Sequence, residues 1–153
     1  MKRFSAILFI LFSFLSSTFS QNDPTQKQDG HWNTLALVTF ESHFDEDFGI
    51  DVQKPIVSPV AKSLEGKEIE VSGYIIPLTG KLEQSHFMLS RYPQSMCFFC
   101  GKAGPESAMQ VFTLGGKKIP FTEDKITVKG TLRINETDVT NLLYTLENGV
   151  VLK

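Results

Sequence analysis

The stretch KEIEVSGYIIP, residues 67–77, is the clearest β-strand in the sequence and says most about the fold. Ile69 and Val71 alternate with charged and small polar residues, the pattern of a strand with one buried face. Residues 74–76 are then continuously apolar. Gly73 lies between the two halves, and a glycine inside a strand predicts a bulge or a sharp bend. A strand bent in its middle is typical of a small barrel that closes on itself.

Similar signals surround this stretch. The sequence predicts further strands at residues 35–40, 86–90, 108–114 and 126–134. The last of these contains a second internal glycine, Gly130. Between residues 142 and 152, Asn148-Gly149 separates two apolar runs, which predicts a tight hairpin. Ser58-Pro59 predicts one short helix as far as Leu64, with Ser58 as its N-cap, and the acidic residues 41–60 predict a long surface loop.

Five to seven short strands and at most one short helix predict an all-β fold. We expect a small OB-like Greek-key barrel, with a β-sandwich as the alternative. The barrel domain would span residues 31–153, because residues 21–30 are polar and without periodicity, as in a flexible lead-in.

The first twenty residues have the pattern of a secretory signal peptide. Lys2 and Arg3 precede a mostly apolar run, and Thr18 and Ser20 suit a cleavage site at or near Ser20. Removing Lys2 and Arg3 changes the net charge from −2 to −4. A mildly acidic chain without a basic stripe disfavours nucleic acid as the main partner. We therefore expect an exported protein, periplasmic or secreted, with no membrane-spanning segment after signal cleavage.

The chain has two cysteines, Cys97 and Cys100, in the string SMCFFCGKAGPES at residues 95–107. This spacing lets two thiolates chelate one ion, and it recurs in zinc sites. In an oxidising compartment two free thiols tend instead to form a disulfide, unless a metal or a reducing partner holds them. The pair therefore predicts a metal site, a disulfide-locked loop or a redox dithiol.

The metal interpretation needs further ligands from elsewhere in the chain. His86 is the best placed, since its strand leads into the cysteine loop. Strand alternation puts His86 and Met88 on one face, with Phe87 and Leu89 on the other. A set of thiolate, imidazole and thioether suits zinc or Cu(I). The candidates for additional ligands are Met88, Glu106 and His43.

The disulfide interpretation makes the loop an interaction module. Phe98 and Phe99 would then be exposed to a partner. Gly101, Gly104 and Pro105 are expected to shape the loop, because glycines allow sharp backbone turns around the sulfurs. A thiol oxidoreductase ranks third, since the sequence lacks the long helix that follows a thioredoxin-like Cys-x-x-Cys pair.

Four short strings occur in an unusual order: GYIIPL at 73–78, FMLS at 87–90, CFFCG at 97–101 and GPES at 104–107. In this the chain resembles an uncharacterised family of exported bacterial proteins, a domain of unknown function. The resemblance implies an OB-like fold and suggests a metal-related role in the cell envelope, with no established activity. Many members carry Cys-x-His and prolines in this loop. Cys97 keeps the matching position, and Cys100 offers a second sulfur where the other pattern has an imidazole.

The sequence as a whole favours an exported, non-enzymatic envelope protein that binds zinc or Cu(I) through Cys97, Cys100 and His86. An envelope protein is the expected partner. The alternative is an interaction module with a Cys97–Cys100 disulfide, and the least favoured function is a thiol oxidoreductase.

Overall fold

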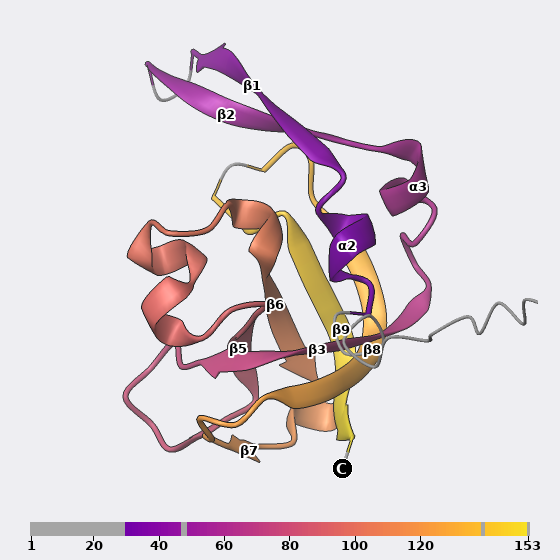
Figure 1. The fold of residues 1–153 in the computed structure, drawn as a ribbon, viewed down its shortest axis with the longest axis vertical. Helices are drawn as coiled ribbons and strands as arrows, with labels where there is room; N and C mark the ends of the chain where they lie inside the picture. The colour runs from indigo at the N-terminus through magenta and orange to yellow at the C-terminus, as the bar shows by residue number, and fades with distance from the viewer. Residues whose placement is uncertain (1–29, 47–48, 139, 153) are drawn as a thin grey trace, which may run out of the picture.

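The fold is built around a closed barrel of five strands, seen in Figure 1. The computed structural model describes residues 30–46, 49–138 and 140–152. The predicted signal peptide and residues 21–29 of the predicted lead-in lie outside them. The barrel strands are β3 (Glu68–Ile76), β5 (His86–Ser90), β6 (Ala108–Thr113), β8 (Ile126–Ile134) and β9 (Tyr144–Leu152).

The order around the barrel is β3-β5-β6-β9-β8, and only the β6–β9 pair is parallel. This is the order of an OB-fold, in which the fifth barrel strand inserts between the third and the fourth. The predicted OB-like Greek-key barrel is confirmed, and closure of the sheet removes the sandwich alternative.

Strand β3 closes the barrel because it has two partners. Residues 68–73 pair with β8, and residues 74–76 pair with β5. Gly73, where a bulge or sharp bend is predicted, is the residue at which β3 passes from one neighbour to the other. The interior faces of these strands form one apolar core, which includes Val71, Phe87, Leu89 and Leu146.

A single helical turn, α2 (Trp32–Leu35), packs against this core. The Trp32 side chain is fully buried, and its Nε1 donates a hydrogen bond to the Ser72 carbonyl oxygen at 2.8 Å. The buried Tyr144 hydroxyl donates to the Leu35 carbonyl oxygen at 2.6 Å. Burial raises the pKa of Tyr144, so this hydroxyl remains a donor.

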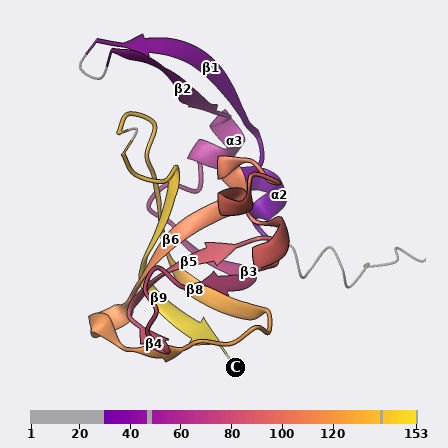
Figure 2. The ribbon, with the colours of Figure 1, turned by 90° about the vertical axis from the view of Figure 1, so that its left-hand side faces the viewer.

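The predicted surface loop at residues 41–60 is wrong. The chain forms an antiparallel hairpin of β1 (Val38–Asp45) and β2 (Ile50–Val57), which extends away from the barrel in Figure 2. The predicted strand at 35–40 accordingly begins later, at Val38, because Leu35 belongs to α2. The hairpin is mostly exposed, so its sequence lacks the regular apolar alternation by which strands are recognised.

The predicted helix after Ser58 is present as α3 (Pro59–Lys62), and the Ser58 hydroxyl accepts a hydrogen bond from the Ala61 N–H. With α2 this makes two helical turns in the described chain instead of at most one.

Short 3-10 turns follow at η1 (Gln94–Met96), η2 (Phe98–Cys100), η3 (Pro105–Ser107) and η4 (Leu114–Gly116). A third sheet among the described residues pairs β4 (Glu83–Gln84) with β7 (Ile119–Pro120). No helix among the described residues is long and apolar enough to cross a bilayer.

The predicted hairpin at Asn148-Gly149 is also wrong, because β9 runs through it as one strand. Asn148 has a left-handed φ of 55°, and the register with β8 shifts there. Lys129 pairs with Val150 and Thr131 with Glu147, so Asn148 and Gly149 both lie opposite Gly130. The dipeptide is therefore a β-bulge that increases the local bend of the barrel wall.

Candidate functional site

The cysteine turn, residues 94–107, is a chain of 3-10 turns beside the end of β5. Cys97 is buried, with 1% of its surface exposed, whereas Cys100 is exposed. Both thiols are free. Cys97 donates to the Cys100 sulfur at an Sγ–Sγ distance of 3.8 Å, and Cys100 donates to the Gln94 carbonyl oxygen at 2.9 Å.

The backbone of the turn holds the two sulfurs on the same side. The Cys100 N–H donates to the Cys97 carbonyl at 3.1 Å, and Gly101 follows with φ of 69°. A side chain is strained in that conformation, so the residue after Cys100 favours glycine. At Gly104 an added Cβ would overlap the Glu106 carboxylate, and Pro105 begins η3. These three residues lie at the turns of this segment, and their loop-shaping role stays a prediction.

The electrostatics of the pair do not favour a thiolate at Cys100 in the metal-free protein. The interaction with the Cys97 thiol is the main cause that raises the pKa of Cys100, and the nearby Lys102 lowers it by less. Reactive dithiols have a lowered thiol pKa, and at Cys100 the direction is the opposite.

Among the candidate ligands predicted in addition to the cysteines, Met88 packs with Cys97. It is buried, and it forms a small apolar cluster with Ile76 and Cys97 that is separate from the barrel core. Strand alternation explains this position: Phe87 and Leu89 point into the barrel core as expected, and Met88 points to the opposite face.

His86 makes other contacts. Its ring stacks on Phe112, with centroids 4.1 Å apart, and its Nε2 donates to the Gln110 Oε1 at 3.0 Å. Glu106 lies in η3 beside Gly104, and His43 is exposed on β1. In the part of the chain that the structure describes, no group of three or more His, Cys, Asp and Glu side chains is arranged to hold a metal ion. The predicted combination of Cys97, Cys100 and His86 is therefore not assembled.

Several of the predicted site residues line a groove of about 890 Å³ between the hairpin and the barrel. They are His43, His86, Met88, Phe98, Phe99 and Pro105. Phe99 is 55% exposed, and its ring meets Phe98 edge to face at 5.2 Å. The cysteine turn thus forms one wall of the groove, and Met88 belongs both to that groove and to the buried cluster with Cys97.

The rest of the lining was not found from the sequence. It comes from the hairpin (Phe40, Asp45, Ile50, Val52, Gln53, Lys54, Pro55), from Leu78 and Gln110, and from the connection between β8 and β9 (Asn135, Glu136, Thr137, Asp138, Thr140, Asn141, Leu142, Leu143). No motif marks these residues, because segments distant in the sequence create the groove.

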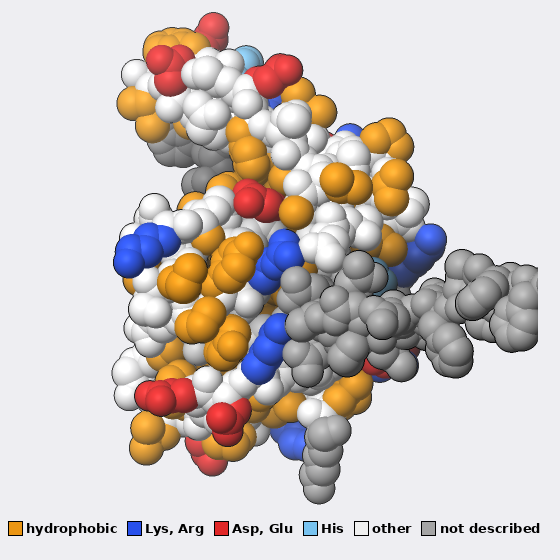
Figure 3. Space-filling model, viewed as in Figure 1, with side chains coloured by type: hydrophobic (Ala, Val, Ile, Leu, Met, Phe, Trp, Pro, Cys, Tyr) orange, Lys and Arg blue, Asp and Glu red, His pale blue; other side chains and the backbone are white. Residues whose placement is uncertain are grey.

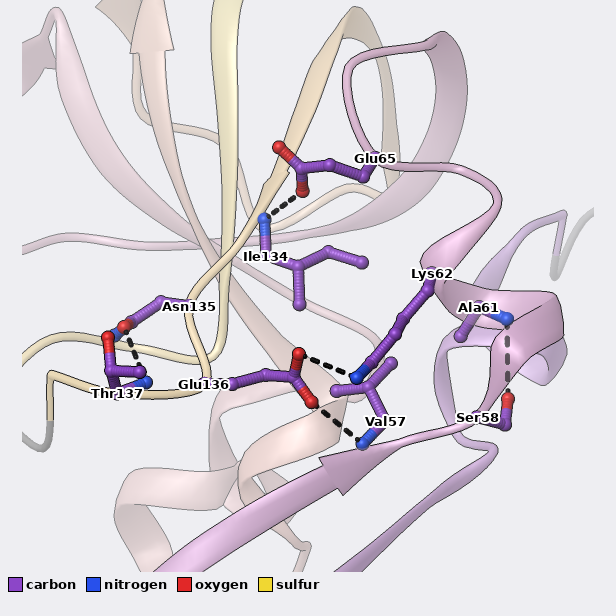
Figure 4. Close-up of polar contacts among 9 residues, drawn as sticks. All are labelled: Val57, Ser58, Ala61, Lys62, Glu65, Ile134, Asn135, Glu136 and Thr137. Carbon is purple, nitrogen blue, oxygen red and sulfur yellow. Dashed lines mark hydrogen bonds and ion pairs between the residues drawn. The ribbon is translucent and has the colours of Figure 1, made fainter.

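Glu136 anchors the hairpin to the barrel at the base of this groove (Figure 4). Its carboxylate accepts a hydrogen bond from the Val57 N–H at 3.2 Å and forms an ion pair with Lys62 at 2.9 Å. Burial raises the pKa of Glu136, but the contacts from Lys62 and the Val57 N–H outweigh burial and lower its pKa overall. The carboxylate is therefore ionised at neutral pH.

Four residues that line the groove are linked by hydrogen bonds, beginning with the bond from His86 to Gln110. The Gln110 Nε2 donates to the Asn141 Oδ1 at 3.5 Å, and the Asn141 side-chain amide donates to the Asp138 carboxylate at 2.6 Å. Hydrogen bonds from Thr140 and Asn141 lower the pKa of Asp138. These contacts fix the His86 ring at the groove lining.

No family model matches the chain, and no curated protein does. Among solved structures, the chain is similar to the crystal structure of a DUF3299 family protein from Pseudomonas aeruginosa PAO1. The similarity covers 65% of this chain and 68% of the other at 19% identity, with a TM-score of 0.44. At this identity and TM-score, the similarity assigns neither a family nor an activity to the chain.

Proposed function

We propose that the protein is an exported, non-enzymatic envelope protein that binds a soft metal ion through Cys97 and Cys100. Cu(I) is the preferred ion and zinc the alternative. The observation that carries the proposal is the Sγ–Sγ distance of 3.8 Å between two free thiols. Two thiolates bound to one ion at about 2.3 Å are about 3.8 Å apart in tetrahedral geometry and about 4.0 Å apart in the trigonal geometry of three ligands. The pair therefore has the spacing of a dithiolate chelate without any movement of the backbone.

The choice of Cu(I) over zinc rests on the ligands available. A structural zinc site needs four ligands, and the described residues supply no third His, Cys, Asp or Glu to the pair. Cu(I) accepts two or three soft sulfur ligands. Met88, buried in the same cluster as Cys97, offers a thioether as a third. His86 is left out of the proposed ligand set, because its Nε2 bonds to Gln110.

The different exposure of the two sulfurs supports a role in metal handling rather than in stabilising the fold. Cys97 is buried and Cys100 is exposed, so an ion held by both would be open to an incoming ligand on one side. Lys102 beside Cys100 would offset part of the negative charge of a dithiolate site. An envelope protein that delivers or accepts the ion is the proposed partner. The order of motifs supports membership of the exported family that the chain resembles.

The test is an anaerobic titration of reduced protein with Cu(I) in the presence of a chromophoric Cu(I) chelator. We expect one bound ion per chain, lost in Cys100→Ser and weakened at least about tenfold in Met88→Leu, which keeps the apolar volume but removes the sulfur. Cys100 is exposed, so the serine variant should fold normally. His86→Gln is the matched control on the same strand and should bind like the wild type.

Cu(I) binding that survives Cys100→Ser would overturn the proposal. Protein purified from its native compartment with a Cys97–Cys100 disulfide and no metal would do so as well, and would favour the interaction module. If His86→Gln loses the ion but Met88→Leu does not, the ligand set proposed from the sequence replaces the present one.

A further inference from the structure

The hairpin of β1 and β2 is a two-stranded sheet, so each strand has one edge without a neighbouring strand among the described residues. An unpaired edge presents a row of N–H and C=O groups that another extended chain can pair with. Isolated two-stranded sheets are also marginal in water, and a third strand stabilises them.

The hydrogen-bond pattern shows which groups of β2 face outward. The Ser58 N–H donates to the Leu37 carbonyl, which makes Leu37 and Ser58 a hydrogen-bonded pair. Alternate pairs along an antiparallel ladder share this property, so the residues between them point away from β1. The Val57 N–H agrees, since it leaves the sheet and donates to Glu136. By the same alternation Asp51, Gln53 and Pro55 direct their backbone groups outward, and proline is tolerated at such a position because it has no N–H to lose.

The outer edge of β2 borders the groove. Val52, Gln53 and Pro55 line it, and the opposite wall carries Phe98 and Phe99 of the cysteine turn. A strand added along β2 would therefore place one of its two rows of side chains against an apolar wall. Backbone pairing and side-chain pockets together are the elements of peptide recognition by strand addition.

The charge of this region favours a basic partner. The described hairpin residues include Glu41, Asp45, Glu46 and Asp51 but only Lys54, and Figure 3 shows acidic side chains on the hairpin at the top of the molecule. Asp138 adds a further carboxylate in the groove lining. A second copy of this chain would bring the same negative charge to the edge, so like charges oppose self-association there.

We infer that the outer edge of β2 and the groove beside it accept an extended segment of a partner protein, with alternating apolar and basic side chains, as a third strand of the hairpin. The apolar side chains pack against Phe98 and Phe99 in the groove wall, and the basic side chains meet the carboxylates of the hairpin and of Asp138. This interaction surface goes beyond the proposed metal binding and does not depend on it.

The experiment uses metal-free, reduced protein and a fluorescein-labelled nonapeptide that alternates Val and Lys, followed by fluorescence anisotropy. The Gln53→Pro variant removes an outward N–H from the edge without touching the β1–β2 ladder. We expect it to weaken binding roughly fivefold to tenfold through the lost hydrogen bond and the proline ring. Ser42→Pro is the matched control, because Ser42 is the cross-strand partner of Gln53 and its N–H points to the other edge. It should change the affinity by less than about twofold.

Two further peptides separate strand addition from other binding. A version with N-methylated alternate residues should lose affinity if backbone pairing is used, and a version that alternates Val and Glu should bind at least about tenfold more weakly because of the acidic edge. Equal binding by wild type and Gln53→Pro, equal binding of both charge versions, or no binding at all would overturn the inference. A concentration-dependent dimer of the protein alone that Gln53→Pro abolishes would show that a second copy occupies the edge, and would overturn it too.

Discussion

Gly73 is the residue at which β3 exchanges one barrel partner for another, and the space around it leaves no room for a side chain. A Cβ added there would lie 2.5 Å from the Ser90 carbonyl oxygen and 2.9 Å from the Leu89 Cγ. The backbone oxygen belongs to the paired strand β5 and is not free to move. Glycine is therefore required here by close approach of the neighbouring strand, not by an unusual φ.

The Gly73→Ala variant should destabilise the protein by about 1–3 kcal/mol through overpacking. The measurement is urea denaturation followed by circular dichroism. Gly80→Ala is the control, because no atom lies within 4 Å of the Cβ position at Gly80, and it should stay within about 0.5 kcal/mol of the wild type. Equal effects of the two substitutions would show that Gly73 is not confined as described.

Asn148 shows where single-residue signals mislead. Asn-Gly predicts a two-residue hairpin because both residues tolerate a positive φ. Here Asn148 does adopt that conformation, at φ of 55°, yet the chain continues in the same direction as a bulge. The positive φ that the dipeptide favours is therefore present. Whether it produces a turn or a bulge depends on β8, because Gly130 on that strand has no side chain and lets the bulged backbone of β9 approach.

At the scale of elements, one carboxylate makes polar contacts that link the barrel to the end of the hairpin. Glu136, in the connection between β8 and β9, contacts the end of β2 and the Lys62 of α3. These contacts lower the pKa of Glu136 below the ordinary value of 4.5. When the pKa of a carboxyl group is lower in the folded protein than in the unfolded chain, the group stabilises the folded state at every pH above its unfolded-state pKa. This stabilisation is lost as the pH falls from the unfolded-state pKa through the folded-state pKa.

The Glu136→Gln variant should therefore be less stable than the wild type at neutral pH, by about 0.5–1 kcal/mol for a partly exposed ion pair. The difference should disappear as the pH falls below 4.5, because the wild-type carboxyl group then becomes protonated. Thermal unfolding as a function of pH measures this.

Glu123→Gln is the control for this prediction. Glu123 is exposed, and its substitution should leave stability unchanged throughout the pH range. A stability difference between wild type and Glu136→Gln that persists at acid pH would mean that the loss comes from packing rather than from charge.

At the scale of the whole molecule, a closed barrel carries a hairpin whose base, at Val38, Phe40 and Val57, packs with the barrel core. The barrel has a continuous apolar core, whereas most of β1 and β2 is exposed. Regions with few buried apolar contacts open more easily than a core. We therefore expect two levels of stability in the one chain.

Native-state hydrogen exchange should resolve these levels. The ladder amides of Lys54 and Val52 should exchange at least about tenfold faster than those of Val128 and Leu146 in the barrel wall, because the hairpin opens without unfolding the barrel. Addition of the Val–Lys nonapeptide should slow the hairpin amides and leave the barrel amides unchanged. Uniform protection across hairpin and barrel would show that they unfold as one unit.

The sequence predicted the barrel better than the site, and particular residues show why. The strands predicted at 67–77, 86–90, 108–114 and 126–134 bury one face against a shared core, so alternating apolar and polar residues reveal them in the sequence. The hairpin buries little of its surface, so its sequence lacks this alternation and predicts a loop instead. In the site, Met88 was predicted opposite Phe87 by alternation, and it does pack with Cys97. Strand alternation gave no means of predicting the Gln110 contact that occupies His86, because Gln110 belongs to another strand.

The residues of each segment were enough to predict the all-β class, the face of β5 that meets the core and the close spacing of Cys97 and Cys100. These features depend on neighbours within a few residues, where the periodicity of a strand and the allowed backbone angles apply directly. Three features could be known only from the folded chain: the bulge at Asn148-Gly149, the pairing of β1 with β2, and the groove between the cysteine turn and the hairpin. Each of these depends on contacts between segments far apart in the chain, and their free energy exists only once the barrel has closed.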